Sequence, residues 1–220
     1  MQRRIYVAGI NTRKLRDAAD SVPYWLLSAT LLRQKHGLPS WLVSHLENRV
    51  LMWDPGTFTE DCISYHGYRA FIDRWARSRD EYLQYDEIGD PDATAFYLHD
   101  MRKRGYDPIP VLQPGGDASI LSEPRAAIGG TVPMGADDRA AYLDELFYHS
   151  GVAITGRIHL LGMWRPEWFR PYFAGSGDST TWIPRAPYNR QMSIPEWLEQ
   201  YGEQNIPYVR RDSIQQRLVI

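Results

Sequence analysis

The feature that most constrains this sequence is the regular alternation of short apolar runs with segments whose apolar residues recur at helical spacing. Such alternation is typical of βα units, in which each strand is followed by a helix that packs on a mainly parallel sheet. We expect strands at residues 5–9, 50–53, 82–88, 109–112, 126–130 and 158–164, and a weaker strand leading into Asp178.

Helices are expected between these strands. Apolar residues at i, i+3, i+4 and i+7 form one stripe from Tyr68 to Trp75. Asp90 is a good N-cap for a helix with Pro91 in its first turn, and Gly105 can end it. Further helices are expected over 137–151, over 24–35, and after a capping box at Ser193.

This pattern fits two α/β architectures: a compact TIM-like (β/α)8-type barrel, complete or lacking a strand, and a doubly wound open sheet. No Gly-x-Gly-x-x-Gly follows the first expected strand, which disfavours the dinucleotide-binding form of the open sheet. We expect one domain over residues 1–220, with residues 184–220 as a C-terminal tail that wraps around the outside.

Composition excludes several classes of protein. The chain has one cysteine, Cys62, so an intrachain disulfide and a cysteine-rich zinc site are ruled out, and the six histidines show no metal-ligand spacing. We therefore expect neither a metal nor another cofactor. No apolar run approaches the about 20 residues of a membrane span, and the segment from Met1 to Val7 lacks a signal-peptide core, which predicts a cytoplasmic protein.

Three aspartates stand at or just beyond expected strands, where α/β enzymes carry their catalytic groups. They are Asp54, Asp86 and Asp178. Each could instead be the N-cap of a following helix, and Asp54 could belong to a plain Asp-Pro-Gly turn. Asp86 is the hardest to explain structurally, because a carboxylate within an apolar run needs a partner when it is buried. Gly129 and Gly130 could bring backbone N–H groups close to a flat ligand, or form a tight bend.

These residues belong to five short motifs that follow one another along the chain. In order they are Asp-Pro-Gly-Thr-Phe from Asp54 to Phe58, Tyr-Asp-Glu-Ile around Asp86, Ile-Gly-Gly ending at Gly130, Leu-Gly ending at Gly162, and Asp-Ser-Thr-Thr-Trp from Asp178. Their order resembles that of the guanine transglycosylase superfamily, most closely its compact, phage-type, DNA-modifying branch. The resemblance covers residues 50–182. Pro55 departs from the family's usual serine, and the Cys/His zinc site of the tRNA-modifying enzymes is missing.

The resemblance implies a base-exchanging pentosyltransferase that replaces guanine in nucleic acid with a 7-deazaguanine derivative. It assigns Asp178 the attack on the sugar C1′, Asp54 the proton of the leaving or entering ring nitrogen, and Asp86 the recognition of the N1–H and exocyclic amine. The amides of Gly129 and Gly130 would meet the O6 side. Phe58 and Gly162 would complete the base slot, although Phe58 could equally pack in the core.

The expected partners are a nucleic acid, DNA in preference to tRNA, and a free 7-deazaguanine-type base, in the host cytoplasm if a phage encodes the protein. A net charge of -2 still allows a local basic surface, and the candidates for phosphate contact are Arg185, Arg190, Arg210 and Arg211. Two other functions remain open: a nucleobase-releasing N-glycosidase, and a non-catalytic base-binding or nucleic-acid-binding subunit.

Overall fold

The structure, a computed structural model, describes residues 4–20, 22–33, 38–58, 61–149, 157–163 and 175–179. These residues contain an eight-stranded parallel sheet in the order β4-β3-β2-β1-β8-β7-β6-β5. The strands are β1 (Arg4–Val7), β2 (Tyr24–Ser28), β3 (Val50–Asp54), β4 (Glu81–Tyr82), β5 (Val111–Leu112), β6 (Ala126–Ile128), β7 (Ile158–Leu160) and β8 (Ser176–Ser179). The mixed α/β fold predicted from the sequence is confirmed.

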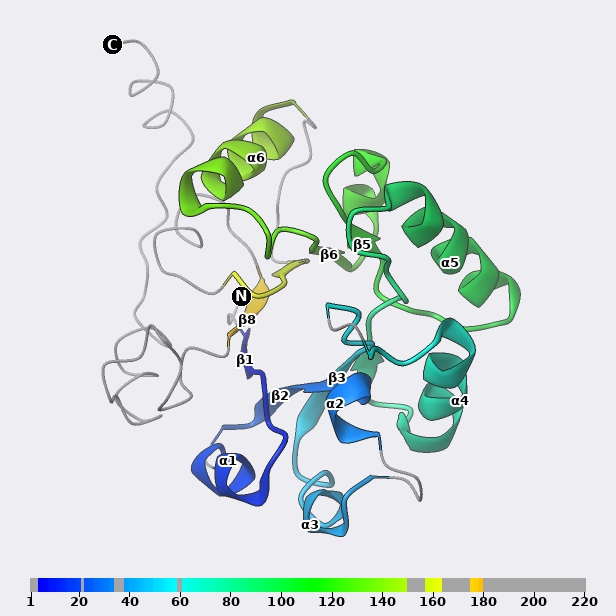
Figure 1. Cartoon of the computed structure of the whole chain (residues 1–220), viewed down its shortest axis with the longest axis vertical. Helices are drawn as coiled ribbons and strands as arrows, with labels where there is room; N and C mark the ends of the chain where they lie inside the picture. The colour runs from blue at the N-terminus through cyan, green and yellow to red at the C-terminus, as the bar shows by residue number, and fades with distance from the viewer. Residues whose placement is uncertain are drawn as a thin grey trace.

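Helices follow most of the described strands in the sequence. They are α1 (Arg13–Ala18), α2 (Ala29–Leu32), α3 (Ser40–Val43), α4 (Tyr65–Trp75), α5 (Pro91–Lys103), the 3-10 helix η1 (Ala118–Ser122) and α6 (Ala136–His149). Figure 1 shows α1, α4, α5 and α6 arranged around the strands, which lie at the centre of the molecule. Since all the strands are parallel, their carboxyl ends lie at one edge of the sheet, which is where the loops leading into these helices begin.

The sheet is curled, and its two edge strands are linked. An isolated parallel bridge pairs Leu83, just after β4, with Ile109, just before β5. The N–H of Ile109 donates to the carbonyl of Tyr82 at 2.8 Å, and the N–H of Gln84 donates to the carbonyl of Ile109 at 3.0 Å. The spatial order of the strands therefore follows their order in the chain around the curl.

Two apolar layers lie on opposite faces of this sheet. One cluster contains Tyr6, Leu26, Met52 and Ala127, and the other contains their chain neighbours, including Val7, Leu27, Trp53 and Ile128. Successive side chains of a strand point to opposite faces, so this division places the first cluster inside the curl and the second beneath the helices. Strands buried on both faces explain why the sequence shows continuous apolar runs.

The helices predicted from caps and stripes are confirmed, with small shifts. In α5 the side chain of Asp90 accepts from the N–H of Ala93 at 2.9 Å. In α4 the buried residues include Tyr68, Phe71 and Ile72, which is most of the predicted stripe. Helix α6 begins at Ala136, so Asp137 lies in its first turn, where a carboxylate favours the helix dipole.

Two predicted elements are wrong. Residues 24–35 were expected to be helical, but Tyr24–Ser28 forms β2 and only Ala29–Leu32 is helix. The run Tyr-Trp-Leu-Leu is buried on both faces, so its side chains carry no alternation that marks a strand. The strand expected over 82–88 ends at Tyr82, and Asp86 lies in the loop beyond it. The helix expected after Ser193 lies outside the described residues.

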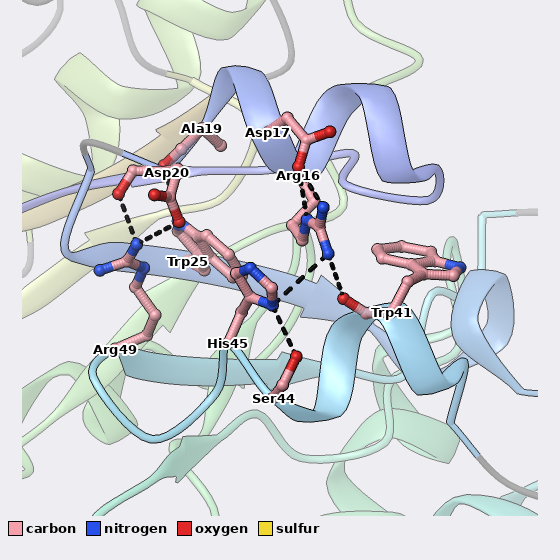
Figure 2. Close-up of polar contacts among 9 residues, drawn as sticks. All are labelled: Arg16, Asp17, Ala19, Asp20, Trp25, Trp41, Ser44, His45 and Arg49. Atoms are coloured by element: carbon pink, nitrogen blue, oxygen red, sulfur yellow. Dashed lines mark hydrogen bonds and ion pairs between the residues drawn. The ribbon is translucent and has the colours of Figure 1, made fainter.

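Polar contacts join α1 and the turn after it to α3 and to the segment that enters β3 (Figure 2). Arg16 of α1 donates to the carbonyl of Trp41 at 2.5 Å and lies 3.4 Å from Nδ1 of His45. Arg49 pairs with Asp20 at 2.7 Å. These contacts cross from α1 to the segment that enters β3, the strand that carries Asp54.

Candidate active site

The carboxyl end of β3 carries Asp54 on a turn that neighbouring backbone holds in place. The carbonyl of Pro55 accepts from Oγ1 of Thr30 at 2.7 Å and from its N–H at 3.3 Å. Gly56 has φ of 74°, in the left-handed region, and an added Cβ would lie 2.2 Å from Oγ of Ser28. Only glycine therefore fits this turn, whose backbone also hydrogen-bonds the Asp54 carboxylate.

Asp86 is buried, with 7% of its surface exposed, and each of its carboxylate oxygens accepts a hydrogen bond from a side chain. Oγ1 of Thr57 donates to Oδ1 at 3.1 Å, and Nε2 of Gln113 donates to Oδ2 at 3.2 Å. Burial raises the pKa of Asp86 to about 6, and the bonds from Thr57 and Gln113 oppose this rise. The partner that a buried carboxylate requires is thus supplied by the loop after β3 and the residue after β5.

Gln113 is itself held by a network. Its Oε1 accepts from the N–H of Gly89 at 3.0 Å, and its Nε2 also reaches Oγ1 of Thr94 at 3.2 Å. An added Cβ on Gly130, whose φ is 66°, would lie 3.0 Å from the Gln113 side chain. The Gly-Gly segment after β6 therefore packs against the side chain that orients Asp86.

Asp178 in β8 is held through one oxygen. Its Oδ1 accepts from the N–H of Gly162 at 2.8 Å and lies 3.2 Å from Nε2 of His159. Among the described residues, Oδ2 has no hydrogen-bond donor. The carboxylate is thus held by β7 and by the turn that follows it.

Asp86 and Asp178 are both close enough to Asp54 to affect it electrostatically. The pKa of Asp54 is raised to about 8, first by burial and then by the negative charges of Asp86 and Asp178. At neutral pH Asp54 is therefore mostly protonated and can donate a proton. Carboxyl groups whose environments separate their protonation states are typical of sites that divide acid and base roles.

The two glycines after β6 differ in what their backbones can contact. The N–H of Gly129 donates to the carbonyl of Leu112 at 2.9 Å and so belongs to the sheet. An added Cβ on Gly129 would lie 2.9 Å from both Leu161 and Val111. Within the described part of the chain the N–H of Gly130 has no acceptor. The amide of Gly129 is therefore taken up by the sheet, which leaves Gly130 as the member of the pair to consider for a ligand contact.

Phe58 and Gly162, the other predicted substrate contacts, are also placed by the structure. Phe58 is 58% exposed in the loop after β3, so it does not pack in the core. The N–H of Gly162 is engaged with Asp178. Arg185, Arg190, Arg210 and Arg211 lie outside the described residues.

Sequence reasoning missed three residues of this site: His159, Gln113 and Thr57. His159 stands between two apolar residues of β7 and Gln113 directly follows the apolar β5. The argument that singled out Asp86, a polar group within an apolar run, applies equally to both. Thr57 lies inside a motif already recognised, and its hydroxyl bonds a carboxylate that lies 29 positions further along the chain.

Two other features are absent from the described residues. No three His, Cys, Asp or Glu side chains there are grouped so as to hold a metal ion. None of the described helices combines the length and apolarity that crossing a membrane demands.

A scan against protein-family models matched none of them, and a search of curated proteins found none that matches this chain.

Proposed function

We propose that the curled sheet is a compact TIM-like (β/α)8-type barrel and that this protein is a base-exchanging pentosyltransferase of the guanine transglycosylase type. In this proposal it replaces guanine in nucleic acid, DNA in preference to tRNA, with a 7-deazaguanine derivative. The barrel is supported by the Leu83–Ile109 bridge between the edge strands and by a strand order that follows the chain. The DNA preference rests on the resemblance to the compact branch.

One observation carries the activity: a carboxylate held through one oxygen lies in electrostatic contact with a carboxyl group that is protonated at neutral pH. Asp178 is the first group and Asp54 is the second. Displacing a nucleobase requires this pair, because C1′ needs a nucleophile while the departing ring nitrogen needs a proton.

In the first step, Oδ2 of Asp178 attacks C1′ as the bond from C1′ to the base nitrogen breaks. The electron pair of that bond goes to the base, which takes a proton from Asp54. The product is a glycosyl ester of Asp178 with the base released. Asp86 and the N–H of Gly130 flank the base, one accepting from its N1–H and amine and the other donating to its O6.

In the second step, the ring nitrogen of the incoming base attacks C1′ and the ester oxygen of Asp178 departs as a carboxylate. Asp54, now ionised, takes the proton of the attacking nitrogen and returns to its starting state. Two displacements at C1′ retain the configuration of the sugar. Exchange in place of hydrolysis requires that water stay away from the ester while one base replaces another.

The test is to incubate the full-length protein with radiolabelled guanine and either double-stranded DNA, single-stranded DNA or tRNA, and to count label in the polymer. Label entering DNA faster than tRNA is the expected result. Faster entry into tRNA would refute the DNA preference and keep the activity.

The same experiment separates the alternatives. Release of guanine from prelabelled DNA without incorporation would indicate a nucleobase-releasing N-glycosidase, in which water takes the place of the incoming base. Binding of free base or nucleic acid with neither incorporation nor release would indicate a non-catalytic subunit.

A further inference from the structure

His159 is completely buried, and both nitrogens of its ring face side chains of the neighbouring strand. Nδ1 lies 2.9 Å from Oγ of Ser176, and Nε2 lies 3.2 Å from Oδ1 of Asp178. Ser176 and Asp178 are two positions apart in β8, so they point to the same face of the sheet, inside the curl. A buried imidazole held between two partners cannot turn without losing both hydrogen bonds.

The ring is also packed so that it stays in this orientation. Tyr6 of β1 meets it edge-on, with 5.5 Å between the ring centroids and an interplanar angle of 80°. Tyr6 is fixed in turn by a hydrogen bond of 3.1 Å to Glu81, which pairs with Arg125. Three neighbouring strands, β1, β7 and β8, therefore determine where the imidazole lies.

The chemistry of Asp178 determines which nitrogen of His159 carries a proton. Oδ1 already accepts from Gly162, and the nucleophile of the proposed reaction is an ionised carboxylate, which has no proton to donate. Nε2 must therefore be the donor in the contact with Asp178. Ser176 occupies Nδ1, as a donor when that nitrogen is unprotonated and as an acceptor when it is protonated.

We propose that His159, held by Ser176, is a positioning residue for Asp178: its Nε2–H and the N–H of Gly162 together fix Oδ1, so that Oδ2 is presented to the sugar C1′. Ser176 precedes Asp178 by two residues and so lies further from the carboxyl end of β8, where it acts on Asp178 through the imidazole. This role rests on the proposed function, in which Asp178 is the nucleophile. The orientation of a nucleophile affects the rate of its attack far more than the binding of the base, which is recognised by Asp86 and Gly130.

Variants at His159 separate positioning from packing. His159→Gln keeps an N–H donor near the position of Nε2, whereas His159→Leu fills similar space without a donor. We expect His159→Leu to lower kcat for guanine exchange by about 100-fold with little change in KM, and His159→Gln to recover part of that loss. Ser176→Ala should lower kcat by a smaller factor, since the ring keeps its bond to Asp178.

The chain provides a matched control for Ser176. Ser44 lies with its Oγ 2.9 Å from Nδ1 of His45, the same kind of contact at an exposed position (Figure 2). Ser44→Ala should leave kcat unchanged. Melting temperatures and near-ultraviolet circular dichroism of every variant report whether the fold is retained.

A second measurement needs no substrate. In nitrogen-15 spectra of the histidine-labelled, unaltered protein, His159 should show a protonated Nε2, with its resonance assigned by its loss in His159→Gln. An unprotonated Nε2 would overturn the proposal, as would equal kcat values for folded His159→Leu and the unaltered protein. If the unaltered protein exchanges no base, the proposed function fails, and the role of His159 fails with it.

Discussion

The backbone N–H of Gly162 donates a 2.8 Å hydrogen bond to Oδ1 of Asp178. Gly162 has φ of 63°, in the left-handed region that favours glycine, so the turn after β7 is shaped to aim this N–H at β8. A carboxylate that accepts a backbone N–H is held without the mobility of a side-chain partner. The Leu-Gly motif therefore holds the carboxylate of Asp178, the candidate nucleophile. This role differs from the substrate contact expected for Gly162.

Replacing Asp178 with Asn should lower base exchange by several orders of magnitude while the protein stays folded. The amide oxygen of Asn can still accept from Gly162, but the side chain cannot form a glycosyl ester. Single-turnover incorporation of labelled guanine measures the loss, and thermal melting checks the fold. Near-normal exchange by a folded Asp178→Asn protein would remove Asp178 from the role of nucleophile.

Exchange should fall as the pH rises through about 8. The first step needs protonated Asp54, whose pKa is raised to about 8 by burial and by the charges of Asp86 and Asp178. Above that pH the protonated fraction drops about tenfold per pH unit, and the rate of glycosyl-ester formation should drop with it. Rates measured from pH 6 to 10 test this. Asp54→Asn should be slow throughout and lack the decline.

Stability gives a check on Asp54 that needs no activity. The pKa of Asp54 is higher in the folded protein than in the unfolded chain, so the folded protein binds a proton at Asp54 more tightly. The contribution of this proton to stability is therefore complete below about pH 4. That contribution is lost as the pH rises to about 8. At pH 9 the free energy of unfolding of Asp54→Asn, measured by urea titration, should therefore be roughly 3–5 kcal/mol higher than that of the unaltered protein. At pH 4 the two free energies should differ little. Equal gains at both pH values would contradict the raised pKa.

Replacing Asp86 with Ala should weaken binding of a guanine-type base by roughly 2–4 kcal/mol, because two donors of the base lose their shared acceptor in a buried site. Isothermal titration calorimetry with free guanine measures the change. The control is Asp100→Ala, which removes a carboxylate from the outer helix α5, where it pairs with Arg104. Unchanged affinity in Asp86→Ala would remove base recognition from Asp86.

Much of the fold follows from the sequence because helix caps and strand ends are local signals. Asp90, Pro91 and Gly105 are enough to bound α5. The helical expectation for β2 fails because a strand buried on both faces has no alternation, and the run that includes Trp25 and Leu27 satisfies either period. That choice is made by the neighbouring strands, since β2 pairs with both β1 and β3.

The site is less accessible to sequence reasoning, since its contacts join residues far apart in the chain. Gln113 and Asp86 are separated by 27 positions, and His159 and Asp178 by 19. Motif order singles out the three aspartates as candidates, but not the side chains that hold them. The difference between the amides of Gly129 and Gly130 also depends on how the strands pair, because the N–H of Gly129 donates to the carbonyl of Leu112 on the neighbouring strand.

Replacing Gly56 with Ala should destabilise the protein by more than the same change at Gly105. Both glycines have positive φ, 74° and 89°, so alanine is strained at each by about 1–2 kcal/mol. At Gly105 an added Cβ meets nothing within 4 Å, whereas at Gly56 it lies 2.2 Å from Oγ of Ser28. That hydroxyl caps α2, and losing the cap costs about 1 kcal/mol more. Urea unfolding of both variants measures the difference, and equal losses would contradict it.

The tail arginines test the nucleic-acid partner. We expect Arg185, Arg190, Arg210 and Arg211 to contact phosphates beside the loops that follow the three aspartates. Replacing Arg210 and Arg211 with Ala should weaken DNA binding, and the slope of log affinity against log salt should become shallower by about one unit per lost contact. The control is the double variant of Arg102 and Arg104, which loses the same charge at surface positions paired with Glu123 and Asp100. If both double variants shift the slope equally, only net charge matters. If neither does, the tail arginines pair with acids such as Glu199 and Glu203, contacts that contribute about 0–1 kcal/mol each.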